Sequence, residues 1–195
     1  MKKQMKIFAA PAAGTAPAVA LVNPKYGHNA AGVLRACSAF GMKQLWISGD
    51  RCLDEWASRG RLPREERMRA YGDVEVCSCN YFYDAYDKAS TRIVAVEVQK
   101  NAVPLTYFQH PENALYVFGP EDGGLGSMHL AHCTDFVIIP SAHCLNLACA
   151  VNVVLAHRTM QRQLAGLEEV RPSYATLDEQ RGFIDSDEAL ASIGN

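Results

Sequence analysis

The sequence predicts an α/β domain with a mainly parallel sheet and helices on both of its faces. Short apolar runs rich in β-branched residues alternate with segments that carry apolar residues at helical spacing along most of the 195 residues. Several runs are apolar at nearly every position, which is typical of strands covered on both faces. The length suits one domain around one core. We expect about five or six strands.

The first 50 residues predict one strand–helix–strand unit. Residues 1–17 are rich in Ala, Pro and Lys, so we expect a flexible lead-in. Residues 18–22 predict a buried strand, and a helix is expected from Asn29, acting as the N-cap, to Phe40. Residues 45–48 predict the next strand, which makes the unit a right-handed crossover by default.

The remaining chain predicts four more strands and three helical segments. The strands are expected at 74–77, 92–98, 113–118 and 135–139, and the helices at 82–88, 128–132 and 144–164. Residues 165–195 carry more Asp and Glu than Arg and show little periodicity, so we expect an acidic C-terminal tail outside a domain of residues 18–164.

The bulk composition is that of an ordinary globular protein, with 49% hydrophobic and 21% charged residues and a net charge of −2. This charge gives no global basic field, so nucleic-acid binding needs a local patch. No apolar run is long enough to span a membrane, and no signal peptide is evident at the start. The seven Cys are scattered and odd in number, which favours reduced thiols and a cytoplasmic location. Their spacing lacks the Cys-x-x-Cys pairs of structural zinc sites, so no metal is expected.

One local basic cluster stands out between two predicted strands. Glu65 and Glu66 are its only nearby acids, and the segment is either a solvated loop or a surface that contacts RNA phosphates. Its members are Arg59, Arg61, Arg64, Arg67 and Arg69, of which the first three are our candidates for RNA binding.

Three polar motifs follow predicted strands, where the carboxyl ends of parallel strands build sites. Gly119-Pro-Glu-Asp-Gly-Gly-Leu125 has glycines that allow close approach to a ligand, although it is also good turn chemistry. Arg35 has no acid three or four positions away, so it is either a solvated residue or a planar fork for phosphate or carboxylate. Asn146 stands at the start of the last helix, where capping is its commonest role. Cys144 lies beside His143, but adjacent side chains point apart, so a nucleophilic pair is not favoured.

Taken together and in this order, Asn29…Arg35, the 119–125 segment and Pro140…Cys144-Leu-Asn146 resemble the SpoU (TrmH-like) family of RNA ribose 2′-O-methyltransferases, in the SPOUT class. The resemblance covers about residues 18–160. It implies a parallel sheet with a deep C-terminal trefoil knot, a pocket for S-adenosylmethionine, a homodimer with the site at the subunit interface, and tRNA or rRNA as substrate.

The resemblance also implies roles for particular residues. The catalytic positions are Asn29, Arg35, Glu121 and Asn146, and the cofactor would contact Val96, Gly119, Ile139, Cys144 and Leu145. We expect Arg35 to fix a phosphate and stabilise the developing alkoxide as a cation, since Arg stays protonated, with Glu121 and Asn146 holding it in place. The chain departs from the family pattern at Cys144, where Ser is usual, and at Ala31, where Gly is usual.

Two other functions compete with this interpretation. The chain could be an inactive knotted RNA-binding assembly factor, which the four catalytic-type residues argue against. It could also be a metabolite enzyme that uses Arg35 and Glu121 on a nucleotide or small acid, which would be active without RNA.

Overall fold

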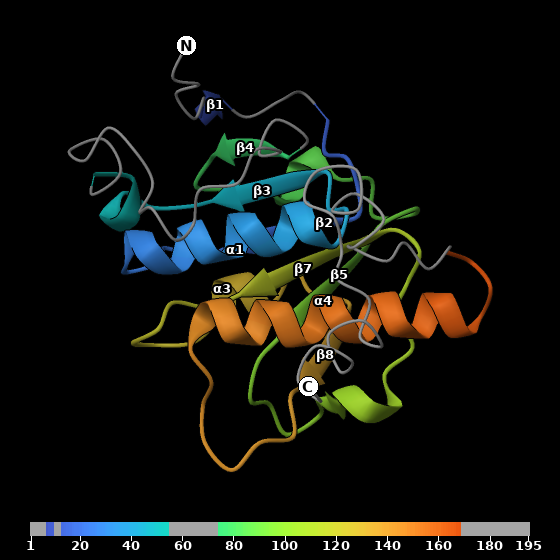
Figure 1. Cartoon of the computed structure of the whole chain (residues 1–195). Coiled ribbons are helices and arrows are strands. Elements are labelled where there is room, and N and C mark those ends of the chain that lie inside the picture. Colours follow the sequence, from blue (N-terminus) through green and yellow to red (C-terminus); the bar gives the residue numbers. More distant parts are fainter. Residues whose placement is uncertain (1–6, 10–12, 55–73, 169–195) are drawn as a thin grey trace, which may run out of the picture. The chain divides into compact units, whose positions relative to one another are not determined.

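The computed structural model of the protein describes residues 7–9, 13–54 and 74–168 (Figure 1). Its strands form one eight-stranded sheet in the order β1-β4-β3-β2-β7-β5-β8-β6, and all the described pairs are parallel. The strands are β1 Ile7–Ala9, β2 Ala18–Leu21, β3 Gln44–Ile47, β4 Glu75–Ser78, β5 Arg92–Val96, β6 Val103–Pro104, β7 Ala114–Phe118 and β8 Asp135–Ile138. The helices are α1 Gly27–Ala39, α3 Ser127–Leu130 and α4 Leu147–Leu164, with short 3-10 turns η3 Tyr83–Ala85 and η4 Leu105–Tyr107. The predicted parallel α/β class is confirmed.

The sheet has more strands than the five or six predicted. Both additions are short: β6 has two residues, and β1 has three and pairs with β4. The expected lead-in over residues 1–17 is therefore wrong for Ile7–Ala9, which belong to the sheet. Such short strands owe their pairing to the neighbouring strand, and two or three residues show no periodicity in the sequence.

Two helix starts differ from the prediction. Helix α1 begins at Gly27 with Tyr26 as its N-cap, so Asn29 lies inside the first turn and is not the cap. Asn29 is only 3% exposed, because its side chain is engaged by a residue far along the chain. Helix α4 begins at Leu147 rather than at 144, and the segment 82–88 contains only the turn η3.

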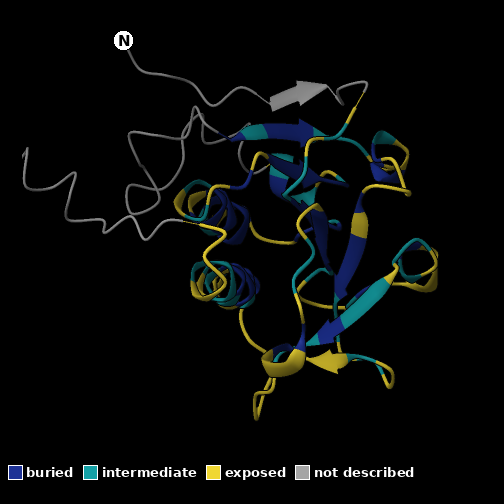
Figure 2. Cartoon of the chain, turned by 90° about the vertical axis from the view of Figure 1, so that its right-hand side faces the viewer, coloured by how far each residue is buried: buried dark blue, intermediate teal, exposed yellow. Residues whose placement is uncertain are grey.

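Side chains alternate between two apolar layers along the strands. Val19 and Leu21 of β2 join a cluster that includes Leu34 of α1 and Val154 of α4. Ala18 and Ala20, on the other side of β2, belong to a second cluster that includes residues of η3 and the partly buried Leu130 of α3. Figure 2 shows α1 and α4 along one face of the sheet, with buried sides turned towards it and exposed sides outwards. Helical elements thus cover both faces.

The register places the carboxyl ends of four central strands at one edge. Leu21 of β2 and Val96 of β5 both lie opposite Phe118 of β7, and Val96 also lies opposite Val137 of β8. The segments that leave these strands therefore start side by side, which is where α/β proteins build their sites.

Candidate active site

The segment after β7 folds into a compact loop that requires glycine at two positions. A Cβ atom on Gly119 would lie 2.5 Å from the backbone carbon of Gly124, so the two backbone segments touch. Gly124 has a φ of +65°, and a Cβ there would lie 2.7 Å from Oε2 of Glu97. Glu97 accepts hydrogen bonds from the backbone N–H of Leu125 at 2.6 Å and of Val98 at 2.8 Å. The carboxylate after β5 thus ties down the loop after β7.

This loop forms one wall of a cavity of about 230 Å³. The five residues predicted to contact a cofactor all line it, and Leu147 and Ala150 of α4 contribute to its lining. The predicted five are Val96, Gly119, Ile139, Cys144 and Leu145. Ser141, Cys144 and Leu145 are exposed, so the cavity is an open cleft, and its walls carry apolar residues together with the carboxylates of Glu97 and Glu121.

A chain of hydrogen bonds links three of the four predicted catalytic residues. The Asn29 amide Nδ2 donates to Oε1 of Glu121 at 2.6 Å, and Asn146 Nδ2 donates to Oδ1 of Asn29 at 2.9 Å. Asn146 Oδ1 accepts from the backbone N–H of Ala148 at 2.9 Å, so Asn146 also caps α4. The capping role expected for Asn146 is confirmed, and the same side chain also contacts Asn29.

The order of donors and acceptors in this chain is fixed at both ends. A carboxylate only accepts hydrogen bonds, so Glu121 orients the Asn29 amide with Nδ2 towards it. The free N–H groups at the N-terminus of α4 only donate, so they orient Asn146 with Oδ1 towards the helix. Burial opposes ionisation of Glu121, but the hydrogen bonds from the Asn29 side chain and the Lys25 backbone N–H hold the pKa of this carboxyl below its ordinary value. Glu121 is therefore an anion at neutral pH.

A second carboxylate in the same loop pairs with cations. Asp122 is 3.0 Å from Nη1 of Arg51 and 3.5 Å from Nζ of Lys25, and the Arg51 contact is the main reason why the pKa of Asp122 is lowered. Arg51 also donates from Nε to the carbonyl oxygen of Asn23 at 3.1 Å. The loops after β2, β3 and β7 are thereby cross-linked. Neither Arg51 nor Glu97 was predicted, because a single charged residue after a strand resembles an ordinary surface residue.

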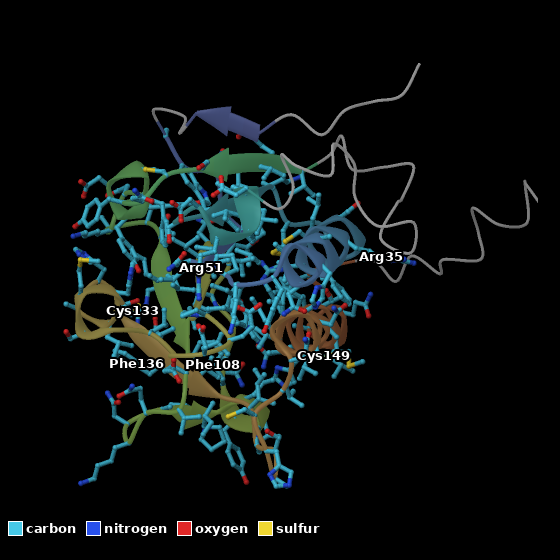
Figure 3. All side chains as sticks on the ribbon, turned by 90° about the vertical axis from the view of Figure 1, so that its left-hand side faces the viewer. Arg35, Arg51, Phe108, Cys133, Phe136 and Cys149 are labelled. Carbon is cyan, nitrogen blue, oxygen red and sulfur yellow. The ribbon has the colours of Figure 1, made fainter. Side chains whose placement is uncertain are left out.

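The fourth predicted catalytic residue lies elsewhere on α1. Arg35 is exposed, and Figure 3 shows it on the outer side of the helix, away from the sheet. Asn29 and Arg35 are about 120° apart around a helix of about 3.6 residues per turn. The bonds described above for Glu121 and Asn146 go to Asn29 and to backbone groups, and the expected contact of these two residues with Arg35 stays a prediction. The RNA-binding candidates Arg59, Arg61 and Arg64 lie outside the described residues.

A model of the SpoU rRNA methylase family matches residues 16–156. The chain belongs to this family. The matched residues include the lining of the open cleft, the residues Glu121, Asn29 and Asn146, and the loops that hold them.

Among curated proteins, this SpoU family member is 30% identical over 156 residues to the tRNA (cytidine-2′-O-)-methyltransferase TrmJ of Methanocaldococcus jannaschii. That alignment covers 70% of this chain and 64% of the relative, so the chain spans somewhat less than two thirds of the length of the protein it matches.

Solved structures show the same fold. The TrmH/SpoU tRNA modifying enzyme of A. aeolicus superimposes with a TM-score of 0.65 at 18% identity, covering 90% of this chain and 84% of that one. The SpoU methyltransferase AviRb of Streptomyces viridochromogenes, solved in complex with the cofactor AdoMet, has a TM-score of 0.59 at 20% identity and covers 75% of this chain and 57% of that one. These likenesses confirm the fold class of this SpoU family member.

Metal sites and membrane-spanning helices are the remaining features to consider. Over the part of the chain that the structure describes, no cluster of three or more His, Cys, Asp or Glu residues is arranged to hold a metal ion. No helix among the described residues is both long and apolar enough to cross a membrane.

Proposed function

We propose that the chain transfers a methyl group from S-adenosylmethionine to a ribose 2′-hydroxyl of RNA. The observation that carries this proposal is the hydrogen-bonded series Glu121–Asn29–Asn146, which reaches the open cleft through Glu121. Family membership and the activity printed for the TrmJ relative support it. For tRNA as the substrate class, the name of that relative is the support, and rRNA remains the alternative.

The cleft fits the proposed cofactor in its chemistry. Leu147 and Ile139 offer apolar surface for a planar base, and the closely packed Gly119 and Gly124 leave backbone groups accessible where a side chain would block them. The cavity is smaller than the roughly 300–1,000 Å³ of enclosed ligand sites, in keeping with its exposed wall at Cys144 and Leu145. When bound, S-adenosylmethionine supplies an electrophilic methyl group on a positively charged sulfur.

The protein's part in the reaction is alignment and charge stabilisation. The protein would have to hold the ribose hydroxyl against the methyl group that the cofactor supplies, while the hydroxyl proton passes to solvent water. Glu121 lines the cleft, and its bond to Asn29, which Asn146 in turn holds, would fix the Glu121 carboxylate in place beside the hydroxyl. Arg35 would bind a flanking phosphate and stabilise negative charge on the oxygen as it develops.

The exposed position of Arg35 supports a homodimer. Arg35 is exposed on the outer side of α1, where it could serve the cleft of a second copy at a shared interface. We therefore propose that two chains associate with their sites at the interface, and that the trefoil knot implied by the resemblance forms the cleft. Size-exclusion chromatography with light scattering measures the association directly.

Methyl transfer is tested with purified protein, isotopically labelled S-adenosylmethionine and unmodified tRNA or rRNA transcripts, followed by mass spectrometry of the nucleosides. We expect 2′-O-methylated nucleosides with the wild type and a loss of rate with Arg35→Ala. A folded Arg35→Ala variant with near wild-type rate would contradict the role of Arg35 and leave the activity standing.

Two outcomes would favour the competing functions. Absence of S-adenosylmethionine binding in calorimetry, with RNA binding intact, would identify an assembly factor. Turnover of a nucleotide or small acid without any RNA would identify a metabolite enzyme.

A further inference from the structure

A small aromatic cluster lies next to the catalytic-type residues and has no part in the chemistry described so far. The rings of Tyr26 and His28 are stacked, with centroids 5.3 Å apart and an interplanar angle of 23°. The ammonium of Lys25 lies 5.2 Å from the centroid of the Tyr26 ring. Tyr26 is 43% exposed and His28 is exposed, so the pair presents aromatic surface to solvent.

The cluster is attached to Glu121 at both of its ends. The backbone N–H of Lys25 donates to Oε2 of Glu121 at 2.7 Å, and the side chain of Asn29 donates to Oε1 at 2.6 Å. Tyr26 and His28 lie between these two contacts in the sequence. The rings are therefore held at a fixed place beside the carboxylate, and not on a free loop.

Local helix physics does not explain the choice of Tyr at this position. Tyr26 is the N-cap of α1 and makes no side-chain capping bond, although Ser, Thr, Asp or Asn would cap the helix there. A residue that breaks a local rule at a site is a candidate for function. An exposed aromatic pair beside a cation is suited to bind a nucleobase, whose faces stack on aromatic rings regardless of base identity.

The charges around the cluster are compatible with RNA. Asp122 is paired with Arg51 and Lys25, and Glu121 accepts two hydrogen bonds, so both carboxylates are already engaged by donors of the protein. The ammonium of Lys25 lies over the Tyr26 ring and 3.5 Å from Asp122, so a cation is part of the cluster.

We propose that Tyr26 and His28 form a stacking platform for an unpaired nucleobase of the substrate RNA that flanks the nucleotide bound at the cleft beside Glu121. This inference rests on the proposed function for the identity of the ligand as RNA. It adds a positioning role: the platform holds the flanking nucleotide, and thereby the ribose, against the cleft. It also predicts that the substrate is single-stranded at this nucleotide, since a base must leave its helix to stack on protein.

The test compares Tyr26→Ala, Tyr26→Phe and the wild type for binding of a short fluorescein-labelled single-stranded RNA. We expect Tyr26→Ala to bind about tenfold more weakly, as for the loss of one base–aromatic stack, and Tyr26→Phe to bind like the wild type. Tyr107→Ala is the matched control, because Tyr107 is 77% exposed on η4, next to the edge strand β6. His28→Ala should weaken RNA binding as well, and it replaces Tyr26→Ala in the test if Tyr26→Ala does not fold.

A second measurement separates stacking from a structural role. In an RNA that carries 2-aminopurine, the wild type and Tyr26→Phe should quench the fluorescence of the stacked base, whereas Tyr26→Ala should not. Equal RNA affinity and equal quenching in wild type and Tyr26→Ala would overturn the platform, as would a wild type that binds no RNA. RNA bound through Tyr26 without any methyl transfer would instead overturn the proposed function and leave the platform standing.

Discussion

Asn29 and Glu121 are 92 positions apart in the sequence, and the Asn29 amide nevertheless donates to the Glu121 carboxylate over 2.6 Å. The parallel pairing of β2 with β7 brings them together, because the segments that carry them leave these strands at the same edge. This one contact decides the role of Asn29, which lies buried in the first turn of α1 and does not cap it.

We expect Glu121→Gln to lower methyl-transfer activity roughly tenfold to a hundredfold. A hydrogen bond to a charged group contributes roughly 1.5–3 kcal/mol, and Gln can present its own N–H towards Asn29, which removes the fixed orientation of that amide. The measurement is the rate of nucleoside methylation at saturating RNA. Asp122→Asn is the control, since its ion pairs are exposed to solvent and therefore weak. Equal rates for Glu121→Gln and the wild type would remove Glu121 from the site.

The stability difference between the wild type and Glu121→Gln should depend on pH. The pKa of Glu121 is depressed in the folded protein, so its contribution is present above the unfolded value of about 4.5 and is lost as the pH falls through the folded pKa. The wild type should therefore be more stable than Glu121→Gln at pH 7, and the difference should shrink below about pH 4.5. Urea unfolding of both proteins at several pH values measures this difference, in which the other carboxylates cancel. A difference that stays constant down to pH 3 would contradict the depressed pKa.

Gly119→Ala should disturb the cleft, whereas Gly126→Ala should not. The new Cβ on residue 119 would meet the backbone of Gly124 at 2.5 Å, and backbone cannot move aside as a flexible side chain can, so we expect a loss of roughly 1–3 kcal/mol of stability. Gly126 has nothing within 4 Å of the added Cβ and an ordinary φ of −68°. Thermal unfolding and calorimetry with S-adenosylmethionine check both variants. Tight cofactor binding by a folded Gly119→Ala protein would argue against the cleft as the cofactor site.

The local pattern of the sequence predicts the main strands, whereas several site residues depend on contacts between distant parts of the chain. The dense apolar runs that form β2, β5, β7 and β8 are long enough to predict strands, and the polar motifs behind them predict the edge where the site lies. Ile7–Ala9 and Glu97 carry no such signal, because a three-residue strand and a lone carboxylate acquire their roles only from partners far along the chain. The position of Arg35 on the outer side of α1 follows from helix geometry. Whether Arg35 reaches a cleft depends on the proposed association of two chains.

Asn146 serves two functions that one pair of variants can separate. Its Oδ1 caps α4 through the backbone N–H of Ala148, and its Nδ2 donates to Asn29. Asn146→Asp keeps an excellent N-cap and loses the donor, so we expect near wild-type stability with low activity. Asn146→Ala loses both bonds, so it should cost about 1 kcal/mol of stability in addition to activity.

Thermal unfolding and methylation rates, measured on both Asn146 variants, provide this test. The informative quantity is the contrast between them: stability should distinguish Asp from Ala, and activity should not. If Asn146→Asp retained full activity, the bond to Asn29 would be dispensable, and the chain of amides from Glu121 to the N-terminus of α4 would serve the fold alone. If Asn146→Ala were as stable as the wild type, the cap would contribute nothing, and activity loss in both variants would trace to Asn29.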